Sequence, residues 1–136
     1  MNRKDEAYFN VAKAVSKTSD FPKHRIGCAV VYKHRLISSG CNRQTTHPKQ
    51  RELNKERFEE DSIHHWKHAE LSALLPLMNR KDIEWNKVKL YLYREFKNGN
   101  KALSRPCKSC QRLIKELGIK RVFYTTNSGY IQEIFD

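Results

Sequence analysis

The feature of this sequence that most limits its fold is one short apolar run, Ile26 to Tyr32 (IGCAVVY). Its length and its β-branched residues are typical of a buried strand rather than of a helix. Lys33 and His34 then turn the chain into a second strand, Leu36 to Cys41. A buried hairpin of this kind needs other elements packed on it, so we expect a layered domain.

The remaining periodic segments alternate between helix and strand. Apolar residues at helical spacing predict helices over about residues 5–17, 63–75 and 106–117. In the last of these, Pro106 is expected as the first helical residue and Gly118 as the C-cap. Alternating or continuous apolar stretches predict strands over about 88–93, 122–126 and 130–135. The expected order is αββαβαββ, which makes the fold class α/β.

The length and composition indicate one globular domain over residues 1–136, with 38% hydrophobic and 31% charged residues. Two segments are expected as insertions. One is the charged stretch at about 49–62, either a solvated helix or a surface insertion, and the other is the turn-containing stretch at about 94–105. No apolar run is long enough for a membrane helix, and the charged N-terminus lacks the apolar segment of a signal peptide. We therefore expect an intracellular, cytoplasmic protein without a membrane partner.

The charge of the chain is strongly basic, with 27 Lys and Arg against 15 Asp and Glu, a formal net charge of +12. The excess is concentrated in residues 1–48 and 79–121. Such a charge favours phosphorylated ligands or polyanions, and it also keeps a small protein in solution.

Two motifs have the residue types of a catalytic zinc site: His68-Ala69-Glu70, in one predicted helix, and Pro106-Cys107-Lys108-Ser109-Cys110, at the start of another. A catalytic zinc ion uses three protein ligands and keeps a fourth position for water. His68, Cys107 and Cys110 would supply one nitrogen and two thiolates. Glu70 lies two residues from His68, close enough to handle a proton of that water without binding the metal.

Each motif alone has a plainer interpretation. A Cys-x-x-Cys pair could be a redox pair or half of a zinc ribbon, although Cys28 and Cys41 lie in predicted strands and do not complete a ribbon. His64 stands at i, i+4 spacing from His68, which could bind zinc as a pair. The favoured alternative is that His64 and His65 are partly exposed residues at the start of the helix.

The two motifs together resemble the cytidine and deoxycytidylate deaminase superfamily, whose signature is H-x-E…P-C-x-x-C. The segment HRIGCAVVYKHRLISSGCN resembles its first hairpin with its Asn, and KHAELSALL resembles its zinc helix. RPCKSCQRLIKELGIKRVFYT resembles its cysteine helix and the following strand. The resemblance implies a three-layer α/β/α sandwich with a mixed central sheet.

The resemblance also implies roles for individual residues. Zn²⁺ would be bound by His68, Cys107 and Cys110, with Glu70 as the catalytic proton carrier. The side chain of Asn42 would contact the sugar, and the backbone N–H of Ala69 would bind the base carbonyl. The implied reaction is hydrolytic deamination at C4 of cytosine, which gives uracil.

Enzymes of this superfamily that act on free cytidine usually have Cys where this chain has His68, so the resemblance leans toward the nucleotide and polynucleotide branches. The substrate is expected to be a deoxycytidine nucleotide, with dCMP converted to dUMP. Candidates for contacting the 5′-phosphate are Lys23, Arg25, Arg43 and Arg94. The alternative is the same chemistry on cytosine within single-stranded DNA or RNA, with Tyr93 and Phe96 as stacking candidates. Trp66 and Trp85 are expected to be core anchors.

Two other functions stay open, a deaminase of adenine and a binding module with a structural zinc site. The resemblance further implies a homo-oligomer, because the last strand could pair with another subunit.

Overall fold

The computed structural model describes residues 2–56 and 65–136. Its centre is a five-stranded sheet in the order β2-β1-β3-β4-β5. The strands are β1 (Ile26–Tyr32), β2 (Arg35–Cys41), β3 (Val88–Arg94), β4 (Arg121–Thr126) and β5 (Gly129–Ile134). The pairing of β3 with β4 is parallel and the other pairings are antiparallel. The expected mixed sheet is confirmed.

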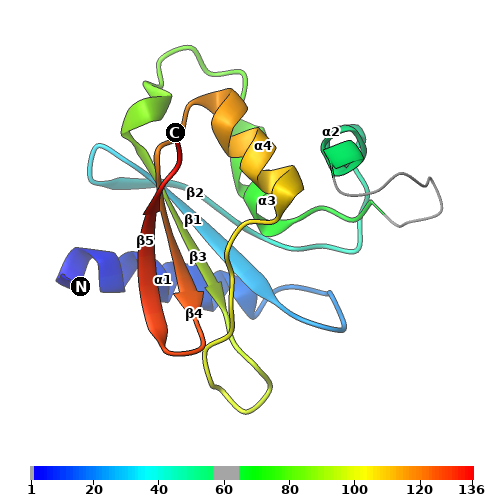
Figure 1. Cartoon of the computed structure of the whole chain (residues 1–136), viewed down its shortest axis with the longest axis vertical. Coiled ribbons are helices and arrows are strands. Elements are labelled where there is room, and N and C mark those ends of the chain that lie inside the picture. Colours follow the sequence, from blue (N-terminus) through cyan, green and yellow to red (C-terminus); the bar gives the residue numbers. More distant parts are fainter. Residues whose placement is uncertain (1, 57–64) are drawn as a thin grey trace.

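Helices cover both faces of this sheet (Figure 1). The helix α1 (Arg3–Ser16) packs on one face, where Phe9 and Ala12 contact Ala29, Val31 and Tyr91. The helices α3 (Ala69–Leu74) and α4 (Lys108–Leu117) pack on the other face, over the alternate residues of the same strands. Successive strand residues point to opposite faces, so one strand supplies both cores. The three-layer α/β architecture is therefore confirmed.

Two glycines let the helices lie close to the sheet. A Cβ atom on Gly27 would lie 1.9 Å from the carbonyl oxygen of Ala12 in α1. On Gly40 it would lie 2.6 Å from the backbone nitrogen of Ala73 in α3. Glycine allows this close approach because it has no side chain. The second contact sets the depth at which α3 lies on β2.

Both helices that carry the signature residues begin later than the sequence predicts. The helix α3 begins at Ala69, and the predicted start near residue 63 is wrong, because backbone hydrogen bonds hold the preceding residues in extended form. Lys67 N–H donates to the carbonyl of Thr45, and Arg43 N–H donates to the carbonyl of Lys67. The helix α4 begins at Lys108, with Cys107 as its N-cap, so Pro106 precedes the helix.

The charged stretch after residue 48 is described as far as Glu56, and residues 57–62 of the expected insertion lie outside the described residues. It contains α2 (Pro48–Leu53) and a 3₁₀ turn, Asn54–Glu56. This helix is not solvated on all sides, because Gln50 and Leu53 are fully buried. Two further 3₁₀ turns, Leu75–Leu77 and Trp85–Lys87, lie between α3 and β3. Pro76 lies in the first of these turns, directly after α3, where it cannot continue the helical hydrogen bonds.

The segment expected as a second insertion, at about 94–105, leaves the sheet and returns to it. Glu95 and Lys101 form an isolated β-bridge around a tight turn that protrudes from the molecule (Figure 1). Ser104 brings the chain back, because its N–H donates to the carbonyl of Thr125 and its hydroxyl donates to the carbonyl of Leu92. Within the described ranges, no helix is long and apolar enough to cross a bilayer.

Candidate active site

Three metal-binding side chains meet between the first turns of α3 and α4. The Nδ1 atom of His68 lies 3.4 Å from the Sγ atom of Cys107 and 3.4 Å from that of Cys110. All three donor atoms lie within 4.8 Å of one another. Tetrahedral zinc with ordinary Zn–N and Zn–S bonds separates a nitrogen from a sulfur ligand by about 3.5 Å. The donor set and its spacing therefore fit a zinc ion.

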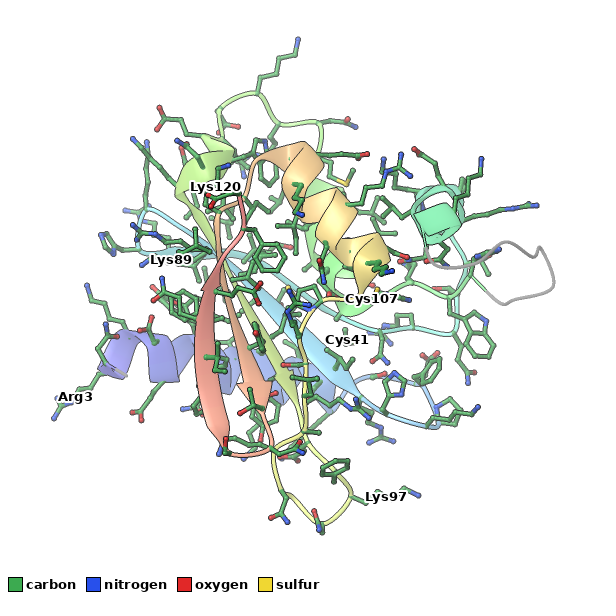
Figure 2. All side chains as sticks on the ribbon, viewed as in Figure 1. Arg3, Cys41, Lys89, Lys97, Cys107 and Lys120 are labelled. Atoms are coloured by element: carbon green, nitrogen blue, oxygen red, sulfur yellow. The ribbon has the colours of Figure 1, made fainter. Side chains whose placement is uncertain are left out.

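The starts of the two helices place these donors and favour the charged form of the thiols. His68 is the N-cap of α3. Cys107, labelled in Figure 2, is the N-cap of α4. The positive end of a helix dipole stabilises a nearby thiolate. A hydrogen bond from Cys110 lowers the pKa of the Cys107 thiol to about 3, against the opposing effect of burial. The same hydrogen bond raises the pKa of Cys110. Cys107 is thus a thiolate at neutral pH, the form that binds metal ions.

A buried chain of amides fixes the backbone of His68. The backbone N–H of His68 donates to Oε1 of Gln50 at 3.0 Å, and Nε2 of Gln50 donates to Oδ1 of Asn54 at 2.9 Å. The amide nitrogen of Asn54 lies 2.9 Å from Nδ1 of His65. Nothing in the sequence singles out Gln50, because a glutamine in a charged stretch carries no signal of its own. Its role depends on α2 packing beside the site.

We expect Gln50→Leu to weaken zinc binding by about tenfold or more, the size of effect seen when groups that orient metal ligands are removed. Leucine keeps most of the buried volume but cannot accept the hydrogen bond from His68. Gln50→Glu keeps the acceptor and should retain more affinity than Gln50→Leu. Competition with a chromophoric chelator measures the dissociation constants, and Gln132→Leu, at an exposed position, is the matched control. Unchanged zinc affinity in Gln50→Leu would contradict this role.

A cavity of about 520 Å³ opens in front of the donor cluster. We call it the catalytic pocket. It brings together most of the residues singled out from the sequence: Asn42, His68, Ala69, Glu70 and Cys107 line it. The sixth, Cys110, is fully buried and belongs to the donor cluster.

Glu70 lies in the first turn of α3 and is only 5% exposed. Burial raises the pKa of its carboxyl, and the negative charge of Cys107 raises it further. Enzymes use such environments to bring a carboxyl group closer to proton exchange at neutral pH. Ala69 is the first residue of the helix, where backbone N–H groups have no partner within the helix. The pocket therefore offers a buried carboxyl group of raised pKa and, in the adjacent residue Ala69, a backbone donor.

Asn42, expected to contact a sugar, has a structural task in this fold. Its Oδ1 accepts hydrogen bonds from the backbone N–H of Ile26 at 3.0 Å and from the hydroxyl of Ser19 at 2.7 Å. Its Nδ2 donates to the carbonyl of His24 at 3.0 Å. The side chain thus ties the segment between α1 and β1 to the end of β2. One amide hydrogen remains for a ligand.

Aromatic residues that the sequence did not mark for the site also line the catalytic pocket. Trp66, expected as a core anchor, lines the pocket together with Phe21. The two rings pack edge to face, with their centres 5.2 Å apart. Trp85 packs against the core as expected. Tyr93 is buried against α1 and donates a hydrogen bond to Glu95, so the expectation that it stacks on bases is wrong. The bridge between Thr46 and Trp66, invisible in the sequence, brings Trp66 here.

The four basic candidates for phosphate binding do not line one common cavity. Lys23 lines the catalytic pocket and a neighbouring cleft, whereas Arg25 and Arg94 line only that cleft. Arg43 lines neither cavity, and its side chain donates to the carbonyl of Thr18.

His64, considered with His68 as a zinc-binding pair, lies outside the described residues. Residues 65–68 precede α3, so His68 has no helical turn before it.

Comparisons with known proteins agree with this geometry. The family model described as the cytidine and deoxycytidylate deaminase zinc-binding region matches residues 2–126. Among curated proteins, none matches the sequence significantly.

Solved structures share the fold at low sequence identity. The dCMP deaminase of cyanophage S-TIM5 in apo form is 22% identical, with a TM-score of 0.64 over 91% of this chain and 84% of that one. The same enzyme in complex with dCMP and dUMP is 21% identical, with a TM-score of 0.63 over 91% and 82%. The cytidine deaminase of Burkholderia pseudomallei is 20% identical, with a TM-score of 0.66 over 98% and 93%. With the match to the family model, the chain belongs to the cytidine and deoxycytidylate deaminase family of zinc-binding hydrolytic deaminases.

Proposed function

We propose that this chain deaminates the cytosine of a deoxycytidine nucleotide, with dCMP converted to dUMP. The observation that carries the proposal is the buried carboxylate of Glu70 in a pocket beside the His/Cys/Cys cluster. A zinc site that only stabilises the fold has no need of such a group. The structural similarity to an enzyme solved with dCMP and dUMP supports the choice of nucleotide.

His68, Cys107 and Cys110 would hold the zinc ion. When bound, zinc lowers the pKa of a water molecule toward about 7 and so makes hydroxide available at neutral pH. Glu70 accepts one proton from the attacking water and delivers it to ring N3. It then accepts the second proton from the oxygen bonded to C4 and delivers it to the exocyclic nitrogen. Protonation at N3 makes C4 more electrophilic. Water oxygen becomes bonded to C4, the bond from C4 to the exocyclic nitrogen breaks, and the products are uracil and ammonia.

The other lining residues orient the substrate. The backbone N–H of Ala69 donates to the carbonyl oxygen of the base, which places C4 toward Glu70. The remaining amide hydrogen of Asn42 donates to the sugar. Lys23, at the mouth of the pocket, binds the 5′-phosphate. Trp66 and Phe21 supply apolar surface that keeps bulk water from the base.

The test is a substrate panel with the zinc-loaded protein, in which mass spectrometry detects uracil formed from deoxycytidine and dCMP, and hypoxanthine formed from dAMP. We expect kcat/KM for dCMP to exceed that for deoxycytidine by at least about tenfold, because the nucleoside lacks the charge-assisted phosphate contact. Lys23→Ala should reduce the ratio of kcat/KM for dCMP to that for deoxycytidine. Turnover of dAMP in preference to dCMP, or of neither nucleotide, would refute the proposal.

A further inference from the structure

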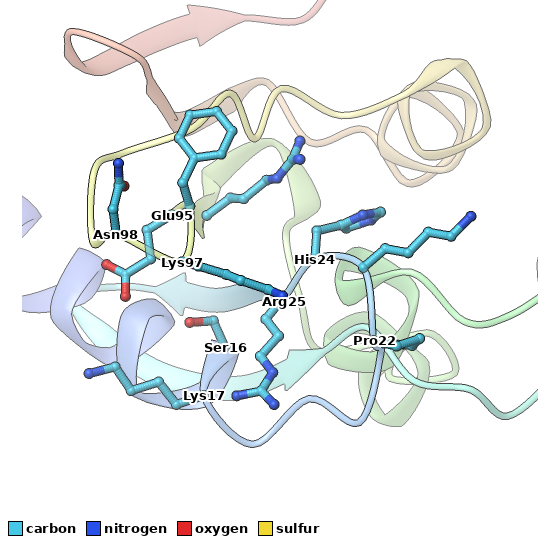
Figure 3. Close-up of a pocket in the computed structure, with 11 residues that line it drawn as sticks. Ser16, Lys17, Pro22, His24, Arg25, Glu95, Lys97 and Asn98 are labelled. Carbon is cyan, nitrogen blue, oxygen red and sulfur yellow. The ribbon is translucent and has the colours of Figure 1, made fainter.

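A second and larger cavity, of about 950 Å³, adjoins the catalytic pocket. It lies between the segment that links α1 to β1 and the protruding turn after β3 (Figure 3). We call it the basic cleft. Lys23 and His24 line both cavities, so the basic cleft lies next to the catalytic pocket.

The lining of the basic cleft is strongly cationic. It contains one carboxylate, Glu95, which accepts a hydrogen bond from Tyr93. Its cations come from both sides of the opening, with Lys17 and Arg25 on one side and Lys97 on the other (Figure 3). The full set is Lys17, Lys23, Arg25, Arg94 and Lys97. Lys17, Lys23, Arg25 and Lys97 form no ion pair with any residue in 2–56 or 65–136.

This charge exceeds what one phosphate group requires. The 5′-phosphate of a mononucleotide in the catalytic pocket can be met by Lys23 at the shared mouth. The cations farther along the basic cleft would then face no anion. Rows of unpaired Lys and Arg that lead away from a site are the feature with which proteins follow a chain of phosphates.

An aromatic side chain in the cleft favours a polynucleotide over the polyphosphate of a free nucleotide as the ligand. Phe96 lines the cleft and is 48% exposed, so part of its ring is accessible to a ligand in the cleft. The guanidinium of Arg94 lies 6.0 Å from the centre of its ring, and Nη1 of Arg94 donates to the carbonyl of Leu103. An exposed ring among cations is the arrangement on which unpaired bases stack. The β- and γ-phosphates of a free nucleotide would make no use of the ring.

We propose that the basic cleft binds the nucleotide joined to the target cytidine, so that this protein binds short single-stranded DNA in addition to the mononucleotide. Lys17 and Lys97 contact its phosphates, and Phe96 stacks on its base. The position of the target cytosine in the catalytic pocket rests on the proposed function.

The test compares the affinities and turnover of three ligands with the full zinc-loaded chain. They are dCMP, dCTP and a fluorescent pentadeoxynucleotide with one cytosine among thymines. We expect the pentamer to bind at least about tenfold more tightly than dCMP at low salt, with a steep loss of affinity as salt is added.

Two variants test the residues of the cleft. Lys17→Ala/Lys97→Ala should weaken pentamer binding by at least tenfold and reduce its salt slope by about 1.4, since each single-strand phosphate contact contributes about 0.7. Phe96→Ala should weaken pentamer binding by about tenfold and leave dCTP binding unchanged. All three substituted residues are exposed and lie outside the catalytic pocket, so dCMP turnover should stay within twofold in both variants.

The control variant Lys4→Ala/Lys120→Ala removes the same charge from exposed positions elsewhere. In Figure 2, Lys120 lies at the opposite end of the molecule from Lys97. Pentamer binding equal to that of dCMP, or equal losses in the two double variants, would overturn the proposal. If the cleft variants lost affinity only for dCTP, the proposal would also be overturned, since the cleft would then bind a triphosphate.

Failure of the proposed function has a different signature. If neither dCMP nor the pentamer is deaminated, the proposed chemistry is refuted. Selective loss of pentamer binding in the cleft variants would still support the basic cleft as a DNA site.

Discussion

Replacing Glu70 by glutamine is expected to lower the rate of cytosine deamination by about 10³-fold or more, with zinc content unchanged. Glutamine has nearly the same shape but cannot accept a proton at neutral pH, and general acid–base catalysis contributes about 10² to 10⁴-fold. In this reaction one carboxylate serves both halves, proton uptake from water and proton delivery to the leaving nitrogen. The expected loss therefore lies in the upper part of that range. The measurements are kcat with dCMP and zinc content by atomic absorption.

The control for Glu70→Gln is Glu84→Gln, at an exposed residue paired with Lys87. It removes the same charge from the chain and should leave kcat unchanged. A Glu70→Gln variant that keeps its zinc and more than a tenth of the wild-type rate would show that another group transfers the protons. Glu70 would then be a buried structural carboxyl, and the interpretation of the chain as a binding module with a structural zinc site would gain support.

Replacing Cys107 by serine should remove zinc from the protein and abolish activity. Serine is a preferred N-cap residue, so the start of α4 is retained while the thiolate is lost. We expect a loss of zinc affinity of more than about 100-fold, beyond the 10- to 100-fold typical of residues that only orient a ligand. Because bound zinc stabilises the folded state by mass action, the variant should also lose the rise in Tm that zinc produces in the wild type.

Cys41→Ala is the matched control for Cys107→Ser. Cys41 is a buried cysteine outside the donor cluster, and its Sγ lies 3.5 Å from the hydroxyl of Thr18. This variant should bind zinc with wild-type affinity even if its stability falls slightly. A Cys107→Ser protein that still binds one zinc ion with wild-type affinity would show that the ion is held elsewhere.

The local pattern of apolar and polar residues was sufficient to predict much of the fold. Continuous or alternating apolar residues mark the strands from Ile26, Val88 and Arg121, because a strand with buried residues needs such a pattern wherever it lies in the sheet. Asn127 and Ser128 mark the last hairpin for a similarly local reason, since they favour a turn. Pattern was misleading at the helix starts. Residues 65–67 have no local reason to avoid a helix, and only their hydrogen bonds to residues 43–46 hold them extended.

The sequence alone was sufficient to predict the candidate zinc ligands and the candidate proton-transfer residue. His68, Glu70, Cys107 and Cys110 have the types and spacing of one kind of metal chemistry, and spacing along a chain survives any error in helix boundaries. Their surroundings depend on tertiary packing: the backbone N–H of His68 donates a hydrogen bond to Gln50, and Trp66 lies in the catalytic pocket. Tertiary packing also decided that the basic cleft joins the α1–β1 segment to the turn after β3. These relations join residues far apart in the chain, and they depend on how the elements pack, which no local pattern records.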